Sequence, residues 1–181
     1  MAIVRLGAVH GRFQPFHLGH LEYVMAALRK CDLLYVGLTS YDRASSQEEL
    51  TAPHRHLASS NPFTFFERLE MVRLALLEAR VEERCFRIVP FPIQDCHRVT
   101  EFVPREACHF VTVYDAWGDA KCRRLEAAGL QVDVLWRRTH RLTSGTELRQ
   151  KLMLGAPVTG LVPPAVEQFL SRSLVGARAC E

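Results

Sequence analysis

The sequence predicts a parallel, doubly wound α/β fold. Short apolar runs typical of buried strands alternate with helical patterns along the chain. Its 181 residues, 48% hydrophobic and 24% charged, suit a globular domain with a real core. No internal repeat or second domain is visible, so residues 1–181 are expected to form one domain.

The first half of the chain contains two candidate strands, at residues 3–9 and 33–38, both short and apolar. Between them, apolar residues at steps of three and four predict one face of a helix: Leu18, Leu21, Met25 and Leu28. Residues 40–61 are polar and without periodicity, so a long loop is expected there. Loops of that length in compact domains are usually functional or mobile.

The second half repeats the alternation. Thr64 is the expected N-cap of a helix, and Glu67 completes a capping box with it. Three more strands are predicted at residues 86–90, 110–114 and 131–136. A helix between the last two runs through Leu125 and ends at Gly129. Further helices start at Ser144 and at Pro163 or Pro164, so that residues 163–181 form a C-terminal helix and tail.

Charge and cysteine content exclude several classes of protein. The net charge of +3 leaves room for a local anion site but does not indicate a nucleic-acid-coating surface. The six cysteines form no Cys-x-x-Cys pair, which argues against a zinc ribbon or a thioredoxin-type site. The start of the chain does not read as a signal peptide, and no apolar run is long enough to span a bilayer. A cytoplasmic protein with reduced thiols and no membrane partner is expected.

Residues 11–20 suggest a phosphate site. They connect the first strand to the first helix, and ligands bind at the carboxyl ends of strands in open α/β sheets. The helix N-terminus offers backbone N–H groups, and Arg12 adds a guanidinium. His17 and His20 are three residues apart and can face one point, while Gly19 allows close approach. Taken alone, such a histidine pair would also fit a metal site or ordinary surface residues.

A second segment, Thr143-Ser144-Gly145-Thr146-Glu147-Leu148-Arg149, begins the fourth predicted helix. Ser144 can be its N-cap and Glu147 the reciprocal capping-box residue, which would explain a helix start without any function. Arg149 lies about one turn into the helix, so hydroxyls, amides and a guanidinium can converge on one anion.

These two segments resemble the nucleotidyltransferase superfamily with the His-x-Gly-His signature. The motifs that carry the likeness are Gly-Arg-Phe-Gln-Pro-Phe-His-Leu-Gly-His, at residues 11–20, and Ser-Gly-Thr-Glu-Leu-Arg, at residues 144–149. Residues 61–68 and 155–166 extend it over most of the chain. Within the superfamily, the sequence is most similar to archaeal-type nicotinamide mononucleotide adenylyltransferases and their bacterial cytidylyltransferase-like relatives.

The resemblance implies a Rossmann-like sheet of about five strands, with His17, His20 and Arg149 as catalytic residues. The nucleotide and its phosphates would be bound by Gly11, Arg12, Phe13, Gln14, Gly19, Ser144, Gly145 and Thr146. A small phosphate-bearing acceptor would attack the α-phosphorus of a nucleoside triphosphate directly, releasing pyrophosphate. Mg²⁺ would be held by substrate phosphates and water rather than by protein ligands. Related enzymes are often homo-oligomers.

The acceptor side departs from the archaeal enzymes. Residues 92–102 lack the Trp that stacks on nicotinamide in that family. The turn that contains Asp115 and Trp117 is instead similar to the turn of bacterial relatives that look like cytidylyltransferases, some of which act on phosphonates. Candidate acceptor residues are therefore His54, Arg55, His56, Asp115 and Trp117. The basic triplet at 54–56 would equally fit a solvated loop, and a zinc site there lacks an evident third ligand.

Three functions follow as hypotheses. The first is adenylyl transfer from ATP to nicotinamide mononucleotide, forming NAD. The alternative is cytidylyl transfer from CTP to a small phosphonate or phosphate ester. A third, minor alternative is a nucleotide-binding regulator without catalysis. Such regulators usually lose a histidine or the phosphate-binding arginine, and this chain retains His17, His20 and Arg149.

Overall fold

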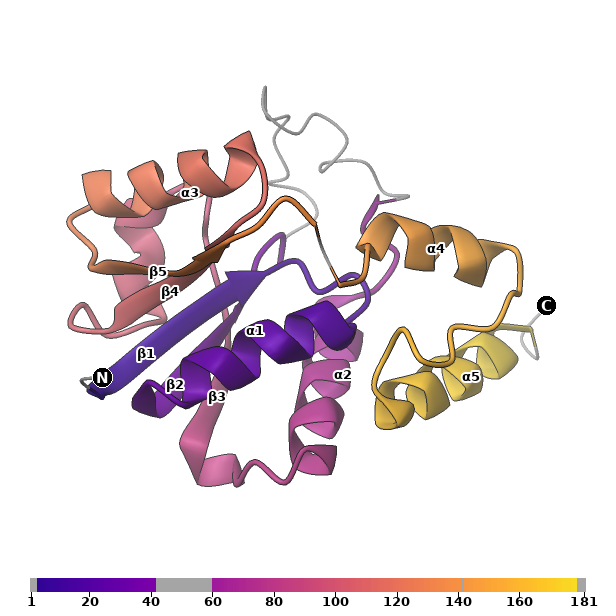
Figure 1. Cartoon of the computed structure of the whole chain (residues 1–181). Helices are drawn as coiled ribbons and strands as arrows, with labels where there is room; N and C mark the ends of the chain where they lie inside the picture. The colour runs from indigo at the N-terminus through magenta and orange to yellow at the C-terminus, as the bar shows by residue number, and fades with distance from the viewer. Residues whose placement is uncertain (1–2, 42–59, 141, 179–181) are drawn as a thin grey trace.

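A five-stranded sheet forms the centre of the molecule (Figure 1), as seen in a computed structural model that describes residues 3–41, 60–140 and 142–178. The strands are β1 (Val4–Gly11), β2 (Cys31–Leu38), β3 (Phe86–Pro90), β4 (Cys108–Val113) and β5 (Val132–Arg137). Their order in the sheet is β3-β2-β1-β4-β5, and every pairing is parallel. The order reverses at β1, which confirms the doubly wound fold and puts a crevice beside the end of β1.

Helices cover both faces of the sheet (Figure 1). Helices α1 (Leu18–Leu28) and α2 (Phe65–Glu78) pack on one face, in a core that includes Val24, Leu34 and Met71. Helix α3 (Ala116–Ala127) and the short helix η4 (Cys96–Glu101) cover the other face, around Val111 and Leu125. The alternating apolar runs predicted from the sequence are buried in these two cores. Helix η4 was not predicted.

The end of the chain adds two helices beside this layered core. Helix α4 (Gly145–Met153) follows β5, and α5 (Pro164–Arg178) packs against α2. A second short helix, η3 (Glu83–Cys85), precedes β3. No helix within the described residues is long and apolar enough to cross a membrane.

The predicted helix caps had different outcomes. The capping box of α2 is confirmed, because Thr64 accepts from the backbone N–H of Glu67 while the Glu67 carboxylate accepts from the N–H of Thr64. Gly129 follows α3 with φ of 73°, as expected for a residue that ends a helix. The prediction of a capping box at Ser144 is wrong. Ser144 occupies the N-cap position of α4, but its side chain makes no capping hydrogen bond.

Candidate active site

A pocket of about 290 Å³ opens at the carboxyl ends of β1 and β4. Its walls come from the loop after β1, the start of α1, the turn between β4 and α3, and the start of α4. The structure brings together every predicted site residue outside the 42–59 segment: Gly11, Arg12, Phe13, Gln14, His17, Gly19, His20, Asp115, Trp117, Ser144, Gly145, Thr146 and Arg149. The predicted acceptor residues His54, Arg55 and His56 lie outside the described residues.

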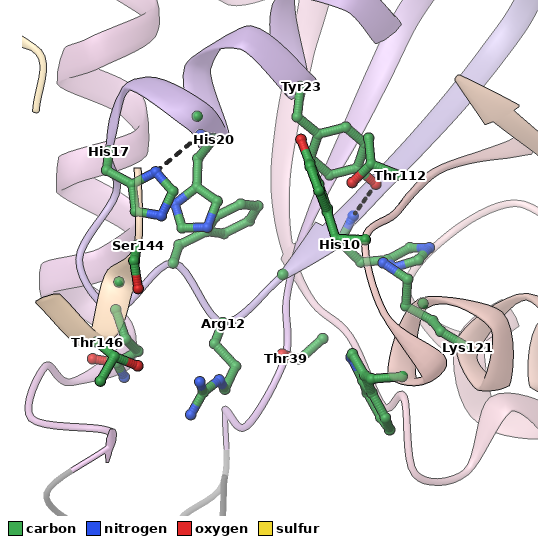
Figure 2. A pocket seen from close by; sticks show the side chains of 18 of the residues that line it. His10, Arg12, His17, His20, Tyr23, Thr39, Thr112, Lys121, Ser144 and Thr146 are labelled. Atoms are coloured by element: carbon green, nitrogen blue, oxygen red, sulfur yellow. Dashed lines mark hydrogen bonds between the residues drawn. The ribbon is translucent and has the colours of Figure 1, made fainter. Parts of the chain in front are cut away.

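His17 and His20 form a stacked pair at the start of α1 (Figure 2). Their ring centroids are 3.5 Å apart, with an angle of 14° between the planes. His17 is the N-cap of the helix, and its Nδ1 accepts from the backbone N–H of His20 at 3.2 Å. The rings of Phe13 and Phe16 pack around His20 and leave it a restricted orientation. The two imidazoles therefore face one region of the pocket, as their spacing predicts.

Gly19 makes room for this pair. A Cβ atom at Gly19 would lie 3.3 Å from both Cε1 and Nδ1 of His17. That separation is tighter than an ordinary van der Waals contact, so a side chain here would push the His17 ring away. The glycine of the first motif thus serves the geometry of the histidine.

Arg149, on α4, brings a buried positive charge to the side of the pocket where His17 lies. Its guanidinium donates to the backbone oxygen of Gln14 at 2.8 Å and to Oγ1 of Thr146 at 3.1 Å. These two bonds fix the arginine between the loop after β1 and the first turn of α4. Burial lowers the pKa of Arg149 from its ordinary value. The side chain is only 8% exposed, and its charge is directed at the pocket by its partners.

The loop that carries Arg12 and Gln14 is anchored to the segment that leads into α2. The Gln14 side-chain amide donates to the backbone oxygen of Phe63 and accepts from its N–H, both at 2.9 Å. Gln14 was expected to bind phosphate, yet its side chain is engaged with the protein. Arg12 donates to the backbone oxygen of Ser60 at 3.4 Å and also lines the pocket.

Arg68 was not predicted as important, but it holds the same loop. This α2 residue is 1% exposed and donates to the backbone oxygens of Arg12, Thr39 and Ser40 at distances of 2.7–3.1 Å. It thereby ties the ends of β1 and β2 to α2. In the sequence it is only the last residue of the family-like segment 61–68, and its residue type does not distinguish it from Arg73 of the same helix.

Asp115 and Trp117 lie at the other end of the pocket. Asp115 is the N-cap of α3, and its carboxylate accepts from the N–H of Gly118 at 3.1 Å. Trp117 lies under the guanidinium of Arg124, 5.1 Å from the ring centroid. Both residues line the pocket.

Sequence reasoning missed His10, Thr112 and Lys121, which line this same end (Figure 2). His10 lies on β1 and is 2% exposed. Burial, followed by the charge of Lys121, lowers the pKa of His10 well below its ordinary value, so the ring is neutral. A histidine near the end of an otherwise apolar strand was the available signal in the sequence.

The described residues contain no group of three or more His, Cys, Asp or Glu side chains that could hold a metal ion. Around the paired histidines the pocket presents cations, hydroxyl groups and two helix N-termini, a combination that suits bound phosphate. Such a set can position a triphosphate and stabilise charge on a leaving pyrophosphate without a nucleophilic side chain.

The comparisons with known proteins agree with this chemistry. The family model for cytidylyltransferase-like proteins matches residues 8–151, so the chain belongs to that family and is a nucleotidyltransferase. A phosphonoformate cytidylyltransferase of Streptomyces viridochromogenes is 47% identical, over 97% of this chain and 96% of the relative. A nicotinamide-nucleotide adenylyltransferase of Thermococcus kodakarensis is 29% identical, over 93% of this chain and 83% of that relative.

Solved structures confirm the fold. A bifunctional NMN adenylyltransferase/ADP ribose pyrophosphatase from Francisella tularensis superposes with a TM-score of 0.71 at 18% sequence identity. The match covers 94% of this chain and 49% of that protein, so this chain spans about half of its length. The Rossmann-like sheet expected from the sequence is therefore the one observed.

Proposed function

We propose that this nucleotidyltransferase transfers CMP from CTP to a small phosphonate that carries a carboxylate, such as phosphonoformate, and releases pyrophosphate. One observation carries the choice of substrates. The relative named for that reaction is 47% identical over nearly the full length of both chains, whereas the adenylyltransferase of T. kodakarensis is 29% identical. The missing Trp in residues 92–102 supports the same choice, because a small phosphonate needs no stacking ring.

In the proposed reaction, a phosphonate oxygen attacks the α-phosphorus of CTP. A new P–O–P linkage forms while the bond between the α-phosphorus and the bridging oxygen breaks, and pyrophosphate leaves with that bond's electrons. His17, His20, Thr146 and Arg149 surround the leaving group and stabilise its charge. The side chain of Arg12 binds the phosphonate. No covalent intermediate on the protein is required.

Mg²⁺ would be held by phosphate oxygens of the nucleotide and by water rather than by acidic side chains of the protein. Its charge would add to that of Arg149 at the phosphates. We assign the reaction to the cytoplasm, where the free thiols of the five described cysteines stay reduced.

The second candidate is adenylyl transfer from ATP to nicotinamide mononucleotide. It is favoured by Trp117 and Tyr114, two aromatic side chains that line the acceptor end and offer surfaces for a pyridine ring.

A pyrophosphate-release assay separates the two candidates. CTP and ATP are each combined with phosphonoformate and with nicotinamide mononucleotide in the presence of Mg²⁺. Release with CTP and phosphonoformate alone is the expected result, and mass spectrometry should then detect the CMP–phosphonoformate product. Release with ATP and the mononucleotide alone would replace the proposal by the second candidate. Without release in any combination, both would be rejected.

A further inference from the structure

His10 has a buried ring whose two nitrogens make no hydrogen bond to the described part of the chain. It lies near the carboxyl end of β1, lines the pocket and is 2% exposed. Buried polar groups are normally paired, because desolvation without compensation is unfavourable. A binding partner supplied by a ligand would resolve this imbalance.

The ring of His10 is held in one orientation. It stacks on Phe91 with centroids 4.3 Å apart and an angle of 23° between the planes. Phe91 occupies space that Gly37 leaves free, since a Cβ atom at Gly37 would lie 2.6 Å from the Phe91 ring. A fixed ring loses little conformational freedom when a ligand binds, which favours a specific contact.

The surroundings of His10 suit an anion. Lys121 lines the same end of the pocket, and its charge acts on the His10 ring. A neutral imidazole retains one N–H donor, so the two side chains offer a donor beside a cation. The carboxylate of Asp115 is also in this wall, but it accepts a hydrogen bond from Gly118 at the start of α3.

His10 lies on the side of the pocket that faces the acceptor rather than the triphosphate. Figure 2 shows His17, His20, Ser144 and Thr146 on one side of the pocket, with His10, Thr112 and Lys121 on the other. The triphosphate is assigned to the first side by the helix N-termini and Arg149. An acceptor that attacks the α-phosphorus in line with the leaving group approaches from the opposite side. The part of the acceptor that does not react then lies toward His10.

We propose that His10 and Lys121 bind the carboxylate of the acceptor and select phosphonates that carry one. The N–H of the His10 ring donates to a carboxylate oxygen, and the Lys121 ammonium neutralises the charge. This inference rests on the proposed function and adds the residues that determine its acceptor specificity.

The test compares two buried histidines. His10→Phe removes the N–H donor but keeps a ring that can stack on Phe91. His109→Phe is the matched control, because His109 is 0% exposed and its ring nitrogens have no hydrogen-bond partner within the described residues. Its ring centroid lies 5.7 Å from that of His10, yet His109 does not line the pocket. In His10→Phe, the KM for phosphonoformate should rise about 10- to 100-fold, the effect of one hydrogen bond to a charged group. The KM for CTP should not change, and His109→Phe should resemble the wild type.

Methylphosphonate, which lacks the carboxylate, provides a second readout. Its inhibition constant against phosphonoformate should be equal in the wild type and in His10→Phe. An unchanged KM for phosphonoformate in His10→Phe would overturn the inference while leaving the proposed function intact. A raised KM for CTP, or the same rise in His109→Phe, would also overturn it.

Calorimetry covers the case in which the wild type does not turn over CTP with phosphonoformate. That failure rejects the proposed function. The binding of phosphonoformate to the wild type and to His10→Phe is then measured directly. If phosphonoformate binds more weakly to His10→Phe than to the wild type, a carboxylate site at His10 is still supported. Equal binding to both proteins, or no binding to either, would reject the site as well.

Discussion

His17 serves both the helix and the pocket. Because its Nδ1 accepts from the N–H of His20, the proton of the neutral ring is assigned to Nε2. Nε2 lies 3.9 Å from where a Cβ of Gly145 would be, so this donor points at the start of α4. The histidine that caps one helix therefore directs its Nε2 at the N-terminus of another, where we propose that the phosphates of the substrate bind.

His20→Ala should lower kcat about 10²- to 10³-fold, the effect of removing one preorganised contact to developing charge. Pyrophosphate release under saturating substrates measures the change. His140→Ala is the control, since His140 is exposed and does not line the pocket. Activity within a few-fold of the wild type in His20→Ala would remove His20 from the catalytic residues.

Helices α1 and α4 contribute to the pocket through their first turns. Both begin at the pocket, so their N–H groups and positive dipole ends act on the same volume. The capping box expected at Ser144 does not form, and this difference has a functional meaning. A Ser144 side chain that is not used for capping remains available to a phosphate, as the proposed function requires.

Alanine substitution of the two N-cap residues should have opposite effects: Thr64→Ala should lower stability, whereas Ser144→Ala should lower activity. Thr64→Ala removes a complete capping box and should lower the free energy of unfolding by about 1 kcal/mol without changing kcat/KM. Ser144→Ala should leave stability unchanged, because no capping bond is lost, but should lower kcat/KM for CTP. Urea unfolding and steady-state kinetics on both variants provide the measurements. A loss of stability in Ser144→Ala equal to that in Thr64→Ala would contradict this assignment.

Replacing Arg68 should lower the free energy of unfolding more than replacing Arg73 on the same helix. Arg68→Met leaves the buried carbonyls of Arg12, Thr39 and Ser40 without their donor, and a loss of about 2–4 kcal/mol is expected. Arg73→Met breaks only an exposed ion pair with Glu83, which is worth about 0–1 kcal/mol. Chemical denaturation compares the two. Similar losses in both variants would show that Arg68 does not hold the loop.

The two faces of the sheet differ in their buried polar groups. His10 and His109 both lie on the face covered by α3 and η4, next to Phe91. Burial lowers the pKa of His109 to about 4 and lowers that of His10 as well. This face of the core thus contains two neutral histidines that the unfolded chain would protonate more readily.

Stability should therefore fall in acid. As the pH decreases from 6.5 toward 4, the unfolded chain takes up protons that folded His109 does not bind. Each such histidine contributes a slope of at most about 1.4 kcal/mol per pH unit, and above the unfolded pKa its contribution to stability is complete. Urea unfolding at a series of pH values measures the slope. His109→Phe should make it shallower, and an unchanged slope would show that His109 is not a buried neutral group.

Local patterns were sufficient for the strands, the main helices and the phosphate end of the pocket. Apolar periodicity predicted five strands in parallel, because burial on both faces demands apolar runs whatever the neighbours are. The motif residues His17, Gly19, His20 and Arg149 were identified by their spacing at helix starts together with the resemblance of their motifs to the nucleotidyltransferase superfamily.

Contacts between distant segments could not be derived in this way. Gln14 and Arg68 bind backbone groups 28–56 positions away, and only the packing of α2 against the sheet ends brings those groups within reach. His10 is similar, since the sequence indicates a polar residue in a strand but not which face it occupies. The sequence alone thus determined the sheet and the helix starts, which depend on local pattern. It also indicated the reaction class, through the resemblance of its two motifs to a known superfamily. Tertiary structure decided the loop anchors and the acceptor wall, because burial and long-range contacts exist only once the chain has packed.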